Sequence, residues 1–150
     1  MIVLDANILI RAVLGRQVQR LLDTYSARGI RFFAPDVALV DAGKYLPSLL
    51  IKRGKPLNEL PATIESLRKM IASIDRDFYL PFEAEARRRL TGRDEDDWPV
   101  SASALGLACA IWTEDSDFFG TGVAVWTTSR IEIFLKARIK EPESSAIDEF

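Results

Sequence analysis

Short apolar segments separated by long helical stretches constrain the fold of this chain more than any other feature of its sequence. Four segments predict strands, and they are Met1–Leu4, Arg31–Ala34, Ala108–Trp112 and Val123–Thr127. Three of them are almost wholly apolar, which is typical of strands that are buried on both faces. Because helical periodicity fills the chain between them, we expect an α/β fold. The expected architecture is a three-layer α/β/α sandwich whose mostly parallel central sheet has about four to five strands.

Apolar residues at helical spacing, with glycine or proline near the ends, predict the helices. One expected helix begins near Pro35 and runs to Gly54, with Pro47 as a point of kinking or division. Another begins at Pro56 and runs to about Ser73. Further helices are expected at 18–26, 81–90, 98–107 and 129–136. The length of 150 residues fits one domain, which we assign to residues 1–140, followed by a polar acidic tail at 141–150.

The composition removes several classes of enzyme. The chain has no histidine and one cysteine, so histidine-containing triads, histidine general bases and cysteine-rich zinc sites are excluded. No apolar run reaches the roughly 20 residues that a membrane-spanning helix needs. The apolar N-terminus lacks a preceding basic region and contains Asp5, unlike a signal peptide. We therefore expect a cytoplasmic protein with no membrane association.

Four aspartates fall where an open parallel sheet binds its ligands, beyond the carboxyl ends of the strands. Asp5 ends the first strand, and Asp115 lies two residues after Thr113 at the end of the third. Asp41 lies in the helix after the second strand, and Asp97 begins the helix that leads to the third. Carboxylates that converge in this way repel one another unless protons or cations neutralise them. Oxygen ligands without histidine suit Mg²⁺ or Mn²⁺.

Three stretches resemble the PIN-domain family, of the kind found as the toxin in VapBC-type toxin–antitoxin pairs. They are IVLDANILI, FFAPDVALVDAGKYL and DDWPVSASALGLACAIWTEDSDF, and the likeness spans roughly residues 1–127. The resemblance implies a metal-dependent ribonuclease that hydrolyses RNA phosphodiesters by in-line attack of water, with Mg²⁺ or Mn²⁺ as cofactor. It also implies a homodimer and an antitoxin that inserts a basic side chain into the acidic site.

The resemblance assigns roles to residues that match the family's motifs. It implies that the metal is held by Asp5, Asp41, Asp97 and Asp115, with Asp117 as an auxiliary acid. The resemblance also implies two residues that support the site. Asn7 is implied to orient the site near Asp5, and Thr113 to steady the loop that carries Asp115.

One departure from the family pattern leaves an alternative open. The family usually has glutamate in its second motif, whereas this chain has Asp41, which is one methylene shorter. A catalytically degenerate PIN-fold module that binds RNA or a protein partner is the alternative. The choice of Asp97 over Asp94 or Asp96 rests on spacing alone. The identity of the RNA and its cleavage sequence is not encoded in any motif.

Two other classes fit the sequence less well. A phosphohydrolase of the haloacid dehalogenase type opens with Asp-x-Asp after its first strand, but Asn7 stands at the third position here. A nucleotide-binding domain of the P-loop type needs GxxxxGK followed by serine or threonine, and the chain has no such motif.

Overall fold

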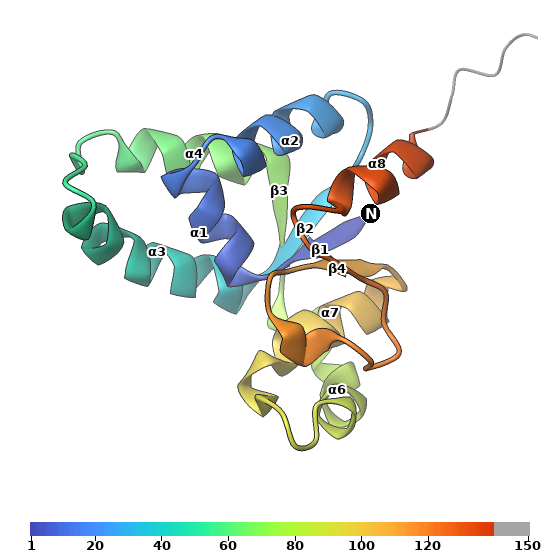
Figure 1. Cartoon of the computed structure of the whole chain (residues 1–150). Helices are drawn as coiled ribbons and strands as arrows, with labels where there is room; N and C mark the ends of the chain where they lie inside the picture. The colour runs from blue at the N-terminus through green and yellow to red at the C-terminus, as the bar shows by residue number, and fades with distance from the viewer. Residues whose placement is uncertain (140–150) are drawn as a thin grey trace, which may run out of the picture.

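The computed structural model describes residues 1–139, which form a five-stranded sheet with helices on both faces (Figure 1). The strand order is β3-β2-β1-β4-β5, and every neighbouring pair is parallel. The strands are β1 (Ile2–Leu4), β2 (Phe32–Pro35), β3 (Ile71–Ile74), β4 (Ala110–Trp112) and β5 (Val125–Trp126). The predicted three-layer α/β/α sandwich is therefore confirmed.

Two helical layers bury the two faces of the sheet in separate apolar cores (Figure 1). The first layer contains α1 (Ala6–Leu14), α2 (Gln17–Ser26), α3 (Asp36–Lys52), α4 (Leu60–Met70) and α8 (Ile131–Arg138). The second contains α5 (Arg76–Tyr79), η1 (Leu80–Phe82), α6 (Glu83–Arg89) and α7 (Trp98–Leu107). The short 3₁₀ helix η2 (Glu95–Asp97) lies between α6 and α7, and η3 (Ser116–Phe118) lies between β4 and β5.

The central strand β1 explains why its sequence is apolar at every position. Ile2 and Leu4 belong to the first core and Val3 belongs to the second, and all three are fully buried. Successive strand side chains point to opposite faces, so a strand covered by helices on both sides has no solvent-facing position. The run therefore ends at Asp5, the first residue at the carboxyl edge of the sheet.

The α7 helix packs closely because its residues are small. Every residue from Trp98 to Ala104 is buried, so the helix has no polar face. A Cβ added at Gly106 would lie 2.9 Å from Phe78 and 3.0 Å from Phe82. A larger side chain at Gly106 would thus require the rings of Phe78 and Phe82 to shift. This close packing fixes the position of Asp97, which precedes α7 at its N-cap position but makes no side-chain hydrogen bond to the helix.

The structure corrects two boundaries that the sequence predicts. The helix expected from Pro56 to Ser73 begins at Leu60 and ends at Met70, and the chain then forms the edge strand β3. Pro47 does not divide its helix, because α3 continues to Lys52. Its ring removes one backbone donor but lies on a helix whose buried side is held by other residues.

The polar tail predicted at 141–150 lies outside the described residues. Within residues 1–139, no helix combines the length and the apolar character that crossing a membrane requires.

The contact between Tyr79 and Asp36 joins α5 to the start of α3. The Tyr79 hydroxyl donates to Asp36 Oδ1 at 2.5 Å, and the backbone N–H of Arg76 donates to Asp36 Oδ2 at 3.2 Å. Burial and the adjacent Asp36 carboxylate raise the pKa of Tyr79. The phenol therefore remains a hydrogen-bond donor throughout the ordinary pH range.

We expect Tyr79→Phe to lower the free energy of unfolding by about 1.5–3 kcal/mol, the usual contribution of a hydrogen bond to a charged group. Urea unfolding at constant m-value would measure the loss. Tyr45→Phe is the matched control, because Tyr45 is 51% exposed and donates no side-chain hydrogen bond within the described chain. Equal midpoints for the two variants would contradict the expectation.

Candidate metal centre

Asp5 lies at the carboxyl end of the central strand, beside the end of β4. Leu4 pairs with Trp112 in the sheet, and the Asp5 backbone N–H donates to the Trp112 carbonyl at 3.1 Å. This register makes Asp5 and Thr113 neighbours, although 108 residues separate them in the chain. The Thr113 hydroxyl donates to Asp5 Oδ2 at 2.8 Å. The other carboxylate oxygen, Oδ1, accepts the backbone N–H of Ala6 at 2.7 Å and so caps α1.

Asn7 links the same carboxylate to the loop after β4. Its Nδ2 lies 3.1 Å from Asp5 Oδ2 and 3.2 Å from Thr113 Oγ1, and it donates to both. Its Oδ1 accepts the backbone N–H of Glu114 at 3.3 Å. Glu114 in turn accepts the backbone N–H of Thr128 at 2.8 Å. Asn7 and Thr113 therefore hold Asp5 in a fixed orientation.

The loop after β4 presents two more carboxylates through a chain of short-range hydrogen bonds. The backbone N–H of Asp115 donates to Thr113 Oγ1 at 2.9 Å. The Asp115 side chain then accepts the backbone N–H of Asp117 at 2.9 Å and caps η3. Thr113 thus contacts both the strand-end carboxylate of Asp5 and the loop that carries Asp115.

Asp97 completes a cluster of three acids at the start of α7. One carboxylate oxygen each from Asp97, Asp115 and Asp117 lies within 4.8 Å of the other two. Asp97 is half-buried, and its Oδ2 is a buried oxygen without a hydrogen-bond partner in residues 1–139. An unpartnered buried carboxylate oxygen is costly, and a bound cation removes that cost. The donor set consists only of carboxylate oxygens, which fits a hard divalent ion.

The pKa values of the two innermost acids are raised. Burial, followed by the negative charges of Asp5, Asp94 and Asp115, raises the pKa of Asp97 to about 8. Burial also raises the pKa of Asp5, with a smaller contribution from Asp115, while hydrogen bonds from Thr113 and Ala6 oppose the shift. Both shifts have the direction expected for carboxylates that share a site without a neutralising charge. A cation bound there would reverse them.

Asp41 reaches the same site from α3 but remains exposed. A cleft of about 310 Å³, including the part open to solvent, is lined by Asp5, Asp41, Asp96 and Asp97, together with small and apolar residues of α1, α3 and α7. Asp41 does not belong to the three-acid group formed by Asp97, Asp115 and Asp117. The structure therefore brings Asp97, Asp115 and Asp117 together. Asp5 is buried close enough to Asp97 and Asp115 to raise their repulsion, whereas Asp41 is an exposed residue of the same cleft.

Arg93 and Asp94 support the site in a way that the sequence does not suggest. The Arg93 guanidinium donates to the backbone carbonyl of Asp117 at 2.7 Å and to that of Phe119. The backbone N–H of Asp94 donates to Asp117 Oδ2 at 3.4 Å. These contacts tie the segment before α7 to the loop after β4. Arg93 appears in the sequence only as one charge in a polar connection, so no spacing rule singles it out.

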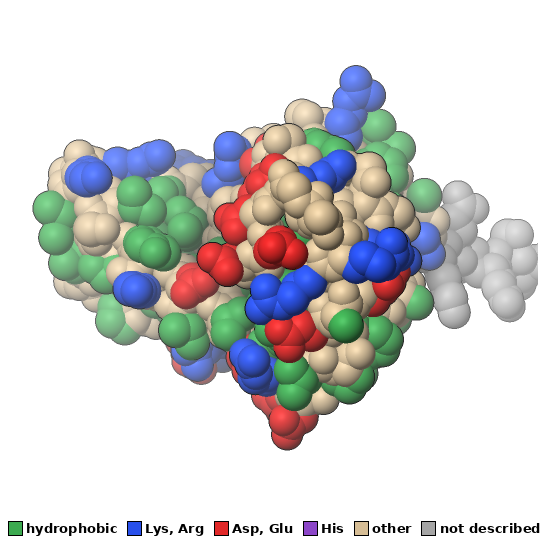
Figure 2. All heavy atoms as spheres, turned by 90° about the horizontal axis from the view of Figure 1, so that it is seen from below, with side chains coloured by type: hydrophobic (Ala, Val, Ile, Leu, Met, Phe, Trp, Pro, Cys, Tyr) green, Lys and Arg blue, Asp and Glu red, His purple; other side chains and the backbone are tan. Residues whose placement is uncertain are grey.

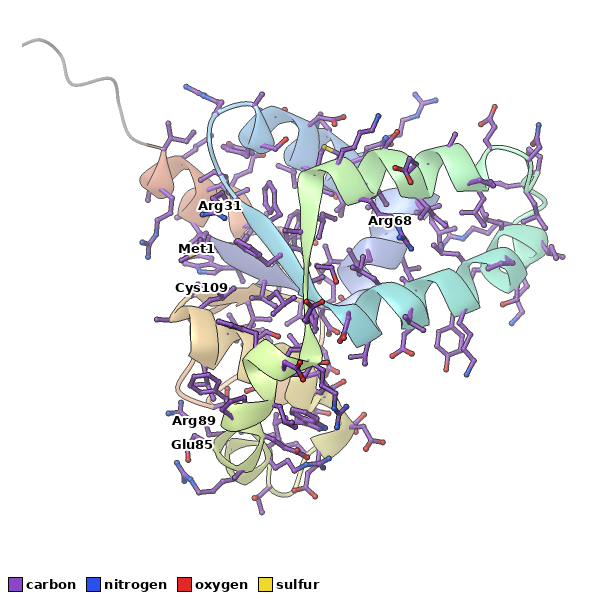
Figure 3. The ribbon with its side chains drawn as sticks, turned by 180° about the vertical axis from the view of Figure 1, so that it is seen from behind. Met1, Arg31, Arg68, Glu85, Arg89 and Cys109 are labelled. Atoms are coloured by element: carbon purple, nitrogen blue, oxygen red, sulfur yellow. The ribbon has the colours of Figure 1, made fainter. Side chains whose placement is uncertain are left out.

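Arg89 on α6 contacts the turn that follows η3. Arg89 donates to the Thr121 carbonyl at 2.9 Å and to Glu85 at 2.9 Å, and Figure 3 shows the Glu85 and Arg89 side chains together on α6. Seen from below, acidic side chains form a broken band across the middle of the surface, with lysine and arginine side chains beside it (Figure 2). This face of the molecule is thus a surface of mixed charge.

Thr113→Val is expected to lower divalent metal affinity by about 10–100-fold, the usual cost of losing a residue that orients a metal ligand. Valine has nearly the same shape as threonine, but it removes the hydroxyl that contacts both Asp5 and Asp115. Isothermal titration with Mn²⁺ would measure the change. Thr113→Ser keeps the hydroxyl and should retain most of the affinity. Equal affinities for the valine and serine variants would contradict this role.

The fold and the site together define an α/β protein with a carboxylate cluster at the carboxyl edge of a parallel sheet. A sequence model of the PIN domain matches residues 3–136. The chain therefore belongs to the PIN domain family, whose members are generally nucleases.

Two solved structures share this fold. FitAB bound to an IR36 DNA fragment is 18% identical, with a TM-score of 0.54, and the match covers 85% of this chain and 95% of that one. FitAcB from Neisseria gonorrhoeae is also 18% identical, with a TM-score of 0.52, and the match covers 86% of this chain and 99% of that one. No curated protein matches the chain in a sequence search.

Proposed function

We propose that the protein is a divalent-metal-dependent endoribonuclease that hydrolyses RNA phosphodiesters, and that it is the toxin of a toxin–antitoxin pair. The observation that carries the proposal is the buried, unpartnered Oδ2 of Asp97 within a group of converging carboxylates. Such a group is stable only with protons or a cation, and the all-oxygen donor set favours Mg²⁺ or Mn²⁺. Membership of the PIN family supports phosphodiester hydrolysis as the reaction.

Each acid has a role in this proposal. Asp5, Asp97 and Asp115 are the ligands that hold the ion, and Asp117 is a further acid of the same group. Asp41 contributes from the rim of the cleft. A bound ion supplies acidification of water and neutralisation of charge on the phosphoryl group. Asn7 and Thr113 orient the Asp5 carboxylate through their hydrogen bonds.

The proposed partners follow from the resemblance to toxins of VapBC-type pairs and from the structural neighbours. An antitoxin that inserts a basic side chain among the carboxylates would neutralise them as a cation does. The likeness to FitAB, which is bound to DNA in its structure, supports the assignment to this class of protein. A homodimer and a cytoplasmic site of action complete the proposal.

The decisive experiment uses the purified chain free of any partner protein and a mixed pool of single-stranded and structured RNA. Cleavage is expected with Mg²⁺ or Mn²⁺, and EDTA should stop it. The cleaved ends should lie within the RNA chain, which distinguishes an endonuclease from an enzyme that trims ends. A DNA pool of the same sequences serves as the substrate control.

The position of Asp41 supports a second candidate, a degenerate PIN-fold module that binds RNA or a protein. Asp41 is exposed and stands where the family usually has glutamate. If the wild type cuts no RNA with either metal but Asp41→Glu does, the shorter side chain accounts for the loss of activity. If neither the wild type nor Asp41→Glu cuts RNA, the nuclease proposal is rejected.

A further inference from the structure

A second groove adjoins the metal centre and is lined by arginine. It lies between α1, α2 and the C-terminal part of α3, and it encloses about 1020 Å³, including the part open to solvent. Asn7 lines its inner end, and Asn7 also donates to Asp5 Oδ2. The groove therefore starts at a residue of the metal centre. Its lining residues include Asn7, Ile10, Arg11, Arg16, Leu49 and Arg53.

The three arginines of the groove carry charge that no carboxylate of the described chain neutralises. Arg11, Arg16 and Arg53 are exposed, and none forms an ion pair with an acid within residues 1–139. By contrast, Arg87, Arg88 and Arg89 on α6 are all paired with glutamate. The groove thus presents free guanidinium groups beside a centre that consists of carboxylates.

The walls of the groove have a defined shape. Asn7 and Arg11 lie one turn apart on α1, and Leu14 ends this helix about 10 Å beyond Asn7, from a rise of about 1.5 Å per residue. The Lys55 ammonium donates to the Leu14 carbonyl at 3.1 Å, which ties the chain after α3 to the end of α1. In Figure 1, α1 and α3 both begin beside the sheet and then diverge, with α1 rising towards α2 and α4 and α3 running to the left. They form a path that leads away from Asp5.

The carboxylates of the metal centre repel the phosphates of an approaching nucleic-acid strand. The chain has a net charge of −2, and the metal centre itself concentrates negative charge. A polyanion approaching it needs nearby cations to hold the phosphates on either side of the reacting bond. Guanidinium groups suit this task because they are always charged and match the geometry of phosphate oxygens. The groove floor, with Ile10 and Leu49, is apolar and suits the faces of unpaired bases.

We infer that this arginine groove binds the sugar–phosphate backbone of single-stranded RNA next to the bond that is cut, with Arg11, Arg16 and Arg53 as phosphate contacts. The inference rests on the proposed action on RNA and adds the path of the substrate strand. An acidic peptide is the competing occupant, and the experiment separates the two.

The test measures binding of a short fluorescent single-stranded RNA of mixed sequence to the full chain in EDTA, so that no cleavage occurs. Arg11→Gln/Arg53→Gln is compared with wild type and with Arg28→Gln/Arg31→Gln. The control pair removes the same charge at the opposite edge of the sheet, where Arg31 precedes β2 (Figure 3). Circular dichroism and melting temperature verify that all variants are folded.

We expect the groove variant to bind RNA roughly tenfold more weakly at low salt, whereas the control pair binds like wild type. The plot of log affinity against log salt concentration has a negative slope. This slope should become shallower by about 0.7 for each lost phosphate contact. Where cleavage is measurable, KM should rise with kcat nearly unchanged, because the carboxylates remain intact. Equal RNA affinity for the groove and control variants would overturn the inference and favour a peptide as the occupant.

The outcomes also separate this inference from the proposed function. Metal-dependent cleavage with no effect of the groove variant would reject the groove and leave the nuclease assignment in place. Weakened RNA binding by the groove variant in a protein that cuts no RNA would reject the nuclease assignment and leave the groove in place.

Discussion

Asp5→Asn is expected to slow RNA cleavage strongly while leaving the protein folded. Asparagine has almost the same size as aspartate and is an equally good residue at a helix N-cap, so α1 should remain capped. The substitution removes one negative charge from the centre and replaces an oxygen that accepts from Thr113 and Asn7. We expect the cleavage rate to fall by at least about 10²–10³-fold, the range for loss of one electrostatic contact in a reacting centre.

Single-turnover cleavage of one defined RNA, with saturating Mn²⁺, would measure this loss. Asp23→Asn is the matched control, because Asp23 is an exposed acid on α2, away from the carboxyl edge of the sheet. The control should cut at the wild-type rate. An Asp5→Asn protein that retains the wild-type rate would remove Asp5 from the set of metal ligands.

Asp97→Asn is expected to stabilise the metal-free protein, although the substitution removes a proposed ligand. The pKa of Asp97 is raised from 3.8 to about 8 in the folded protein. Between these two values the folded state retains a proton that the unfolded state releases. The free energy of unfolding of the metal-free protein therefore falls as the pH rises through this window, and the full cost is present above about 8.

Asparagine carries no charge at any of these pH values, so it removes both the repulsion and its pH dependence. The melting temperature in EDTA at pH 8 should rise by roughly 2–4 °C for each kcal/mol of repulsion relieved. The wild type should instead gain stability when Mn²⁺ is added, and this gain should be larger at higher pH, since binding displaces the proton of Asp97. Asp97→Asn should lose most of that gain.

Melting curves from pH 5 to pH 9 in EDTA would test the stabilisation by Asp97→Asn. The same curves with Mn²⁺ would test the loss of metal-dependent stability. Asp75→Asn is the control, because Asp75 is exposed and its side chain caps no helix. A variant that melts below the wild type in EDTA at pH 8 would show that Asp97 stabilises the fold in its metal-free form, contrary to the expectation.

The sheet was predictable from the sequence where strands are buried on both faces. The segments around β1, β2 and β4 are apolar because helices cover both sides, and this pattern is readable without a structure. The sequence does not predict the edge strand β3, because its apolar pattern merges with that of the preceding helix. Ile71 continues the helical spacing of Ile64 and Leu67, so the helix α4 and the strand merge into one apolar pattern. Its Ala72 and Ser73 are exposed at the edge and give no strand signal.

The geometry of the candidate site is only partly encoded in local sequence. Strand ends identify Asp5 and Asp115, because parallel strands end at the same edge. The choice among the acids at 94–97 depends on tertiary packing, which buries half of Asp97 and leaves Asp94 and Asp96 exposed. The contact of Arg93 with the carbonyls of Asp117 and Phe119 also depends on packing, since 24 and 26 residues separate the partners.

The pairing of β1 with β4 has a consequence for biosynthesis. The first strand of the chain is the centre of the sheet, and its partner at β4 is made more than a hundred residues later. A nascent chain that ends before Thr113 holds Asp5 without Thr113, Asp115 or Asp117. Domains generally fold as units once their chain has emerged from the ribosome. The order of synthesis therefore keeps the carboxylate cluster incomplete until the loop that carries Asp115 and Asp117 has been made.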